Sequence, residues 1–158
     1  MRSDLASFIT PTALLAHWQA HRRLTRRVIA AFPEEELFKF SVGAMRPFGR
    51  LAMEIIKMSA AVSHGLATGR WVQSNRQTPA TQGELLGVWD EVTAELDSWW
   101  PQIPAHRFLE TVSAFGQYTG AAHDLVLYAI DNEVHHRGQG YVYLRALGVS
   151  PPEFQDRS

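Results

Sequence analysis

AAHDLVLYAIDNEVHHRGQGYVYLRALGVSPP, residues 121–152, is the stretch that decides the fold of this chain. Its apolar residues predict one long helix over residues 121–147. Gly148 and the prolines beyond it would end that helix, because glycine suits the left-handed position after a helix and proline cannot continue one. Within the helix, residues 131–139 read DNEVHHRGQ, a polar and ionisable segment between two apolar flanks. The helix therefore carries both a packing surface and the most concentrated chemistry of the chain.

Three earlier helices complete the prediction. Thr10 followed by Pro11 is a standard helix opening, in which the threonine side chain caps the first turn. The pattern Thr81-Gln-Gly-Glu84 is a capping box and opens another helix. Apolar residues at helical spacing then place the three helices at 11–31, at 47–68, and from 81 to shortly before Pro101.

The predicted fold class is all-α. Four helices of this length in a cysteine-free chain favour an antiparallel four-helix bundle that occupies a single domain, residues 1–158. The stretch before the last helix contains several helix breakers. Two short β-type runs there, at 107–112 and 113–118, predict a small hairpin.

Composition excludes several classes of protein. The chain has 158 residues, no cysteine and a formal charge of −1. The lack of cysteine excludes disulfides and thiolate ligands, so that a metal would need His, Asp, Glu, Asn or Gln donors. The near-neutral charge lacks the basic signature of nucleic-acid binding. No apolar run approaches the roughly 18 residues of a membrane span, and the N-terminus does not read as a signal peptide. We therefore expect a cytoplasmic protein with no nucleic-acid or membrane partner.

One basic cluster stands out against this balance. It consists of five residues of the first predicted helix: His21, Arg22, Arg23, Arg26 and Arg27. On a helix these side chains spread around much of the circumference. We interpret them as a solvated face rather than as a phosphate-binding surface.

The polar segment of the last helix has the spacing of metal ligands. Residues four apart lie on one face of a helix, so Asn132 and His136 point together, as do Asp131 and His135 on a neighbouring face. Metal sites in helical bundles combine such a pair with a further ligand from a facing helix. The same residues are also compatible with a purely structural layer of hydrogen bonds, and spacing alone leaves both interpretations open.

Glu54 is the candidate for the facing ligand. It lies in the apolar run LAMEII, residues 51–56, where a buried carboxylate is costly unless it is paired or binds a metal. The alternative is a surface glutamate whose carboxylate reaches solvent, as most glutamates do.

The last helix also carries a family resemblance. The run HHRGQGYVYLRALGVSPP, residues 135–152, resembles the C-terminal signature of the DinB/YfiT-like family, His-x-x-x-His-Arg-Gly-Gln followed by an apolar helix, a glycine and two prolines. The segment MRPFGRLAME, residues 45–54, is similar to the second helix of that family. The resemblance spans the chain in order and length, and the last-helix motif is its specific part. It implies an up-down bundle in which three histidines hold a divalent metal.

This chain departs from the family pattern at two of the three ligand positions. His136 matches the second histidine of the motif, but Asn132 stands at the first, and Glu54 stands at the position in the second helix. The resemblance thus implies a metal site of Glu54, Asn132 and His136, with zinc or nickel as the expected ion. Oxygen donors in place of two imidazoles either retune such a site or abolish it. Arg137 and Gln139 also match the motif, and we expect structural roles for them.

Two functions are compatible with these residues. The first is a metal-dependent enzyme acting on a small molecule, of the thiol-dependent transferase or hydrolase type that the resemblance implies, with a low-molecular-weight thiol as partner. His135 or Glu133 is the candidate catalytic base, provided that it faces the pocket. The second is a non-catalytic, stress-associated binding protein in which the three predicted ligands form a metal-free polar layer. The resemblance and the many aromatic residues also favour a homodimer.

Because the net charge is slightly negative, the chain should not bind duplex DNA at physiological salt. An electrophoretic mobility shift with a random-sequence duplex measures this, and we expect no retention of the duplex at about micromolar protein. Salt-sensitive retention at submicromolar protein would show instead that the basic cluster of the first helix binds phosphates.

Overall fold

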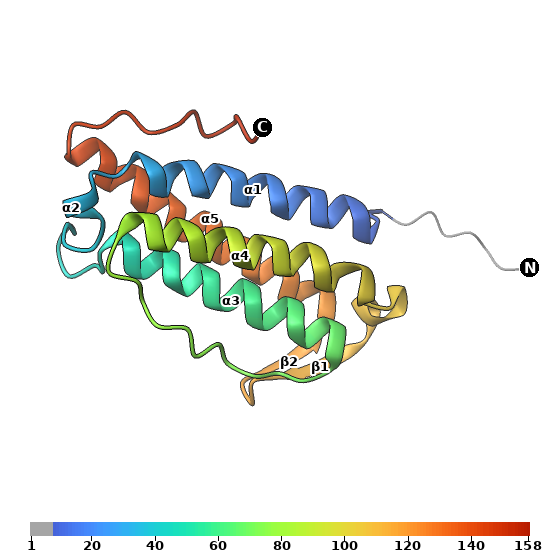
Figure 1. Ribbon diagram of the computed structural model, residues 1–158. Helices are drawn as coiled ribbons and strands as arrows, with labels where there is room; N and C mark the ends of the chain where they lie inside the picture. Colours follow the sequence, from blue (N-terminus) through green and yellow to red (C-terminus); the bar gives the residue numbers. More distant parts are fainter. Residues whose placement is uncertain (1–7) are drawn as a thin grey trace, which may run out of the picture.

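The computed structural model describes residues 8–158 as a helical bundle with one β-hairpin (Figure 1). The all-α bundle predicted from the sequence is confirmed. No helix among these residues is both long and apolar enough to cross a membrane. The long helices are α1 (Pro11–Ala31), α3 (Phe48–Thr68), α4 (Gln82–Trp99) and α5 (Ala122–Ala146). The short elements are α2 (Glu34–Leu37), the 3₁₀ helices η1 (Trp100–Gln102) and η2 (Ala105–Leu109), and the strands β1 (Thr111–Ala114) and β2 (Tyr118–Ala121).

The helix ends have the chemistry that the sequence predicts. The Thr10 hydroxyl accepts a hydrogen bond from the first turn of α1. Thr81 and Glu84 form the reciprocal capping box at the start of α4. Gly69 and Gly148 follow α3 and α5 with φ angles of 75° and 76°. This left-handed conformation, which glycine adopts without strain, ends both helices.

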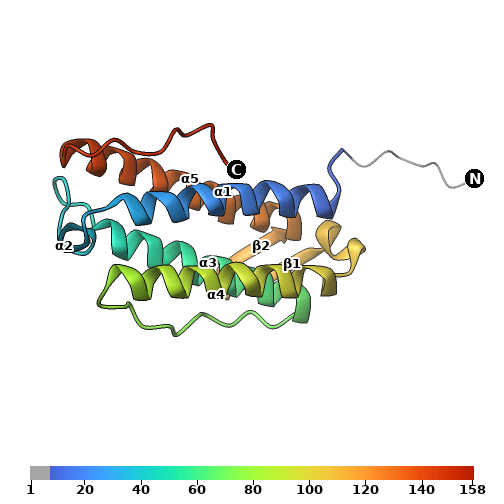
Figure 2. The same ribbon diagram turned by 45° about the horizontal axis from the view of Figure 1, so that its top comes forward.

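Helix α3 packs against both α4 and α5, and α1 closes the bundle against those two (Figures 1 and 2). α3 and α4 run in the same direction, and both run opposite to α1 and α5 (Figure 1). The connection 69–81 allows this because it returns along the whole of α3. An extended chain covers about 3.3 Å per residue, which suffices for the ~31 Å of a 21-residue helix.

The predicted hairpin exists, but it lies later in the chain than expected. The start of the first predicted strand belongs to η2 instead, and the two strands pair antiparallel over four residues each. Phe115 and Gly116, which were expected inside the second strand, form the turn. Both have positive φ angles, 55° and 67°, and the Gln117 amide donates to the Ala114 carbonyl at 3.1 Å. The predicted strand bounds were wrong because a phenylalanine rarely occupies such a turn.

The core consists of two apolar halves with a polar layer between them. One half packs around Phe48 and Trp89, and the other around Trp18 and Trp100. All four long helices contribute polar side chains at the level between the halves. These are His21, Arg22 and Thr25 of α1, Ser59 of α3, Thr93 of α4, and Glu133 and Arg137 of α5.

The Arg22 guanidinium is the centre of this polar layer. It donates hydrogen bonds to the Thr93 hydroxyl at 3.0 Å, the Ser59 hydroxyl at 3.0 Å and the Trp89 carbonyl at 3.2 Å. The interpretation of the basic cluster as a solvated face is therefore wrong for Arg22 and His21, whose exposed fractions are 0% and 5%. Both lie on the face of α1 that packs into the bundle. The sequence did not predict this position, because charged residues usually lie at the surface.

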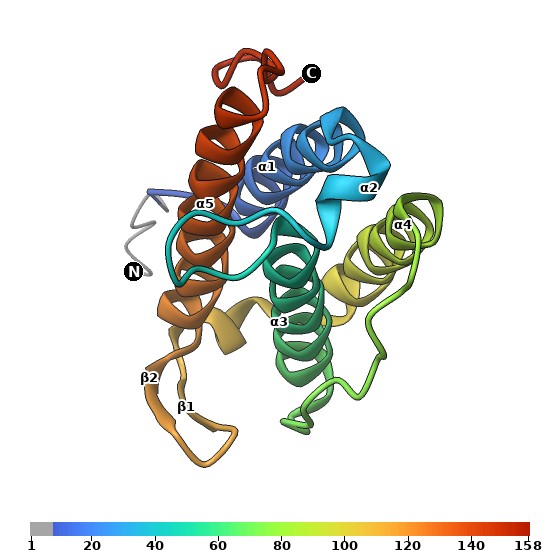
Figure 3. The ribbon, with the colours of Figure 1, turned by 90° about the vertical axis from the view of Figure 1, so that its left-hand side faces the viewer.

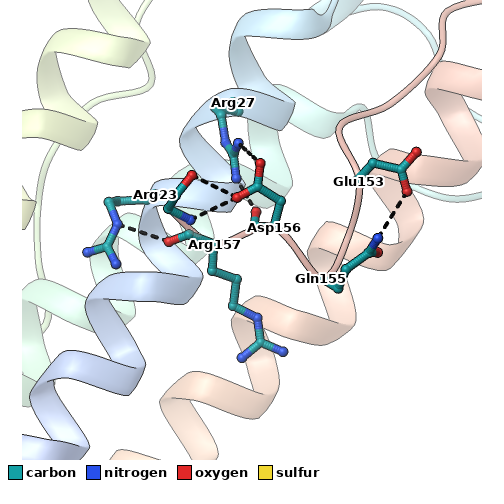
Figure 4. A network of polar contacts seen from close by, with 7 residues as sticks. Arg23, Arg27, Glu153, Gln155, Asp156 and Arg157 are labelled. Carbon is teal, nitrogen blue, oxygen red and sulfur yellow. Dashed lines mark hydrogen bonds and ion pairs between the residues drawn. The ribbon is translucent and has the colours of Figure 1, made fainter.

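The chain after α5 returns across α1 and is held there by charged groups (Figures 1 and 4). The Arg27 guanidinium pairs with the Asp156 carboxylate at 3.2 Å, and the Arg23 guanidinium donates to the Arg157 carbonyl at 3.1 Å. The Arg157 guanidinium in turn lies 3.3 Å from Nε2 of His21. Two further members of the basic cluster thus bind a segment of their own chain.

Two glycines of α5 should respond in opposite ways to alanine. A Cβ on Gly140 would lie 2.6 Å from a ring carbon of the buried Phe48, so Gly140→Ala should lower the free energy of unfolding by about 1–3 kcal/mol. A Cβ on Gly138 would meet no other part of the chain within 4 Å, so Gly138→Ala should raise it by about 0.5–1 kcal/mol through helix propensity. Urea unfolding followed by circular dichroism measures both. Equal effects would contradict the close packing of α5 on α3.

Candidate functional site

The structure brings together the three residues predicted as metal ligands. Glu54 of α3 faces Asn132 and His136 of α5, which lie one turn apart on the same face of that helix. Nε2 of His136 lies 2.9 Å from Glu54 Oε1, and the Asn132 amide donates to the same oxygen at 3.2 Å. Because an ionised carboxylate only accepts hydrogen bonds, Nε2 of His136 is the donor in the first contact.

Arg46 completes this group, and no sequence pattern pointed to it. Its guanidinium lies 2.6 Å from the second carboxylate oxygen of Glu54. Arg46 precedes α3, and the Tyr143 hydroxyl of α5 fixes its backbone by donating to the Arg46 carbonyl at 2.9 Å. We call Arg46, Glu54, Asn132 and His136 the Glu54 cluster.

The Glu54 cluster stabilises a negative charge. Burial would raise the pKa of Glu54, but hydrogen bonds from His136, Arg46 and Asn132 outweigh it and lower the pKa from 4.5 to about 2. The carboxylate is therefore ionised at neutral pH. Its side chain is 34% exposed, whereas that of His136 is 8% exposed. Glu54 is the member of the pair that solvent and small molecules reach.

The donor set does not fit the three-histidine metal site that the resemblance implies. Zinc sites use at least three protein ligands, and no group of three His, Cys, Asp or Glu side chains within residues 8–158 is arranged to hold a metal. The Arg46 guanidinium already pairs with Glu54, and its charge would repel a cation bound to the same carboxylate. Asn132 turns its N–H toward Glu54, and its carbonyl oxygen is buried without a hydrogen-bond partner among the described residues.

Glu54 forms part of the wall of an open groove of about 870 Å³, which we call the α3 groove. Residues of α3, of the hairpin with the first turns of α5, and of the connection before α4 line the groove, and α3 lies between the other two (Figure 3). Its volume lies in the range of small-molecule sites. The lining combines cations with aromatic and methionine side chains, namely Arg46, Arg50, Lys57, Phe38, Phe115, Tyr118, Tyr128, Met53 and Met58.

Neither candidate base lines the α3 groove. His135 is exposed on the surface of α5, with its ring centroid 5.1 Å from that of His136. Glu133 is fully buried on the side of α5 that faces α1, where the Thr25 hydroxyl donates to its carboxylate at 2.6 Å. Burial raises the pKa of Glu133, and the charge of Arg22 acts against that rise. The role of His135 or Glu133 as a catalytic base required a side chain that faces the pocket, and neither side chain does.

The side of α5 that faces α1 holds a second group of ionisable residues. The Arg137 guanidinium donates to the His21 carbonyl at 3.2 Å and to the Thr25 hydroxyl at 3.2 Å, and it lies 3.1 Å from Nδ1 of His21. Burial, together with the charges of Arg137 and Arg157 and the neighbouring His17, lowers the pKa of His21 from 6.5 to about 4. Arg137 therefore joins α5 to α1, which is the structural role expected of it.

Comparison with known proteins places these observations in a family. The model of the DinB family matches residues 5–158. A DinB-like protein (YjoA) from Bacillus subtilis has a similar structure, with 15% identity, a TM-score of 0.73 and coverage of 90% of this chain and 98% of that chain. A DinB-like protein from Bacillus cereus ATCC 10987 is similar with 18% identity, a TM-score of 0.73 and coverage of 90% and 95%. A search of curated proteins found no match to the chain.

Protonation of His21 should destabilise the fold. Its folded pKa of about 4 lies below the ordinary value of 6.5, so the unfolded chain takes up the proton first as the pH falls. Stability is then lost as the pH drops from about 6.5 to about 4. His21→Gln should flatten this part of the curve of unfolding free energy against pH, as measured by urea unfolding across that range. Parallel curves for the two proteins would show that another group is responsible.

Proposed function

Because the chain belongs to the DinB family, we propose that it is a small-molecule-binding protein whose Glu54 cluster works without a resident metal. The ion pair between Arg46 and Glu54 is the observation that supports this function most directly. Here a guanidinium of the chain itself supplies the positive charge that a divalent ion supplies in a three-histidine site. Of the two functions compatible with the sequence, this is the metal-free one.

In this function the Glu54 cluster acts as an ordered polar element of the α3 groove. Hydrogen bonds from Arg46, Asn132 and His136 hold the carboxylate in one orientation. A carboxylate has about four lone-pair directions, and the partial exposure of Glu54 leaves it open to a hydroxyl or amide of a ligand. The groove around it provides the apolar contacts that bind the rest of such a molecule.

A metal-dependent enzyme is the second candidate, and one observation favours it. The buried carbonyl oxygen of Asn132 has no hydrogen-bond partner among the described residues, and Asn132 stands at a ligand position of the family pattern. Unpaired buried polar atoms are rare in folded proteins, and coordination to an ion is one way in which such an oxygen is satisfied. Zinc or nickel, a small-molecule substrate and thiol-dependent transferase or hydrolase chemistry belong to this candidate.

Metal uptake distinguishes the two candidates. Purified without a histidine tag and equilibrated with zinc or nickel, the chain should retain no stoichiometric metal in elemental analysis. A variant with both Glu54→His and Asn132→His should retain one ion, because three imidazoles suit both metals. Adding Arg46→Gln to that variant should tighten metal binding further, since it removes a neighbouring positive charge.

The control for this experiment is His136→Ala. In the variant with Glu54→His and Asn132→His, this change should abolish metal retention. In the original chain it should change stability alone. Stoichiometric metal in the original chain that His136→Ala removes would contradict the metal-free proposal and show the metal site that the second candidate requires.

A further inference from the structure

We propose that the α3 groove binds an organic anion with an aromatic or otherwise flat apolar body. This inference rests on the proposed function, because it names the class of ligand for the same groove. Three features of the groove carry it: an excess of positive charge, an aromatic side formed by the hairpin and α5, and a strained backbone that holds one of the aromatic rings.

Positive charge exceeds negative charge along the α3 groove. Three cations, Arg46, Arg50 and Lys57, line it against one carboxylate, that of Glu54, which Arg46 already pairs. The side chains of Arg50 and Lys57 form no hydrogen bond or ion pair with any residue in the range 8–158. Two uncompensated cations in one groove are notable in a chain whose formal charge is −1. They favour an anionic ligand.

The spacing of these cations directs them to one place. Arg50 lies four residues before Glu54 and Lys57 three residues after it, so all three share one face of α3. An arginine presents a planar fork that matches a carboxylate or phosphate, and a lysine adds a mobile point charge. An anionic group held by Arg50 and Lys57 would therefore lie beside the Glu54 cluster, whose own charge Arg46 offsets.

The side of the groove formed by the hairpin and α5 is aromatic. Phe115 and Tyr118 of the hairpin and Tyr128 of α5 line it. The Tyr118 hydroxyl donates to the Ala121 carbonyl at 2.8 Å, so its one hydrogen-bond donor is used within the hairpin. Aromatic faces of this kind bind flat apolar groups by stacking and by burial of surface.

Phe115 occupies a backbone conformation that few bulky residues adopt. Its φ angle is 55°, and Gly116 after it is also positive, an arrangement in which Asn-Gly is the favoured pair. Strain of this kind collects at ligand-binding sites. The Phe115 ring packs edge-on against Trp71, with centroids 5.6 Å apart, and it contributes to the groove wall. A role in ligand binding accounts for a phenylalanine where asparagine would relieve the strain.

Isothermal titration calorimetry of the full chain with 2-naphthoate and with neutral 2-naphthamide tests this proposal. The two probes share an aromatic body and differ in charge. We expect naphthoate to bind about tenfold more tightly at low salt, the factor that a single charge-assisted hydrogen bond provides. Arg50→Gln combined with Lys57→Gln should remove this difference and leave the helical circular dichroism spectrum unchanged.

The matched control is Phe115→Asn. It suits the turn and removes the ring, so the affinity for both probes should fall while the urea midpoint stays level or rises. If the ring served only to stabilise the hairpin, its removal would lower the urea midpoint and leave the affinity for both probes unchanged. That result would overturn the role of Phe115 in binding. Equal affinities for the two probes, or no binding of either, would overturn the proposal of an anionic ligand. The metal-uptake experiment tests the proposed function separately, because the affinity for either naphthalene probe does not change the amount of metal that the chain retains.

Discussion

A guanidinium without access to solvent constrains the whole bundle. Removing an ion of this size from water costs several kcal/mol, which only well-placed hydrogen bonds and an opposite charge can offset. Arg22 obtains its hydrogen bonds from Ser59 of α3 and from Thr93 and the Trp89 carbonyl of α4, and its opposite charge from Glu133 of α5. We infer that this requirement fixes how far each helix can slide along its neighbours. Apolar contacts alone tolerate such sliding far better, because they have no direction.

The same constraint positions the groove. On α5, Glu133 and Arg137 face α1, while Asn132 and His136, one position earlier in each case, face α3. One polar segment thus serves two partners, and its two faces alternate in the way that the helical repeat requires. When Glu133 and Arg137 anchor α5 against α1, the other face of the segment is brought to the level of Glu54 on α3.

Much of the fold could be read from local sequence, because helix caps and apolar spacing act over a few residues. The four long helices begin and end within about a residue of their predicted bounds, which is as close as helix ends are defined, whereas the short helix α2 was not predicted. The features that were missed depend on distant partners. Arg22 looked like a surface cation because its hydrogen-bond acceptors, such as Ser59 and Thr93, lie on other helices. Arg46 had no signal at all, since a hydroxyl of α5 positions its backbone. The family resemblance located Glu54, Asn132 and His136, but not the cation that pairs with Glu54.

The polar layer at mid-length also bears on how the bundle opens. Amide hydrogens exchange with solvent through partial unfolding, and segments that open together exchange together. If the two apolar halves met directly, either could fray from its end and gradually draw in the other. Here any opening that reaches the middle of the bundle separates Arg22 and Glu133 from their partners. Fraying from either end therefore stops at that level. Protection from exchange would then be greatest at the centre of all four helices, around the most polar part of the interior rather than the most apolar.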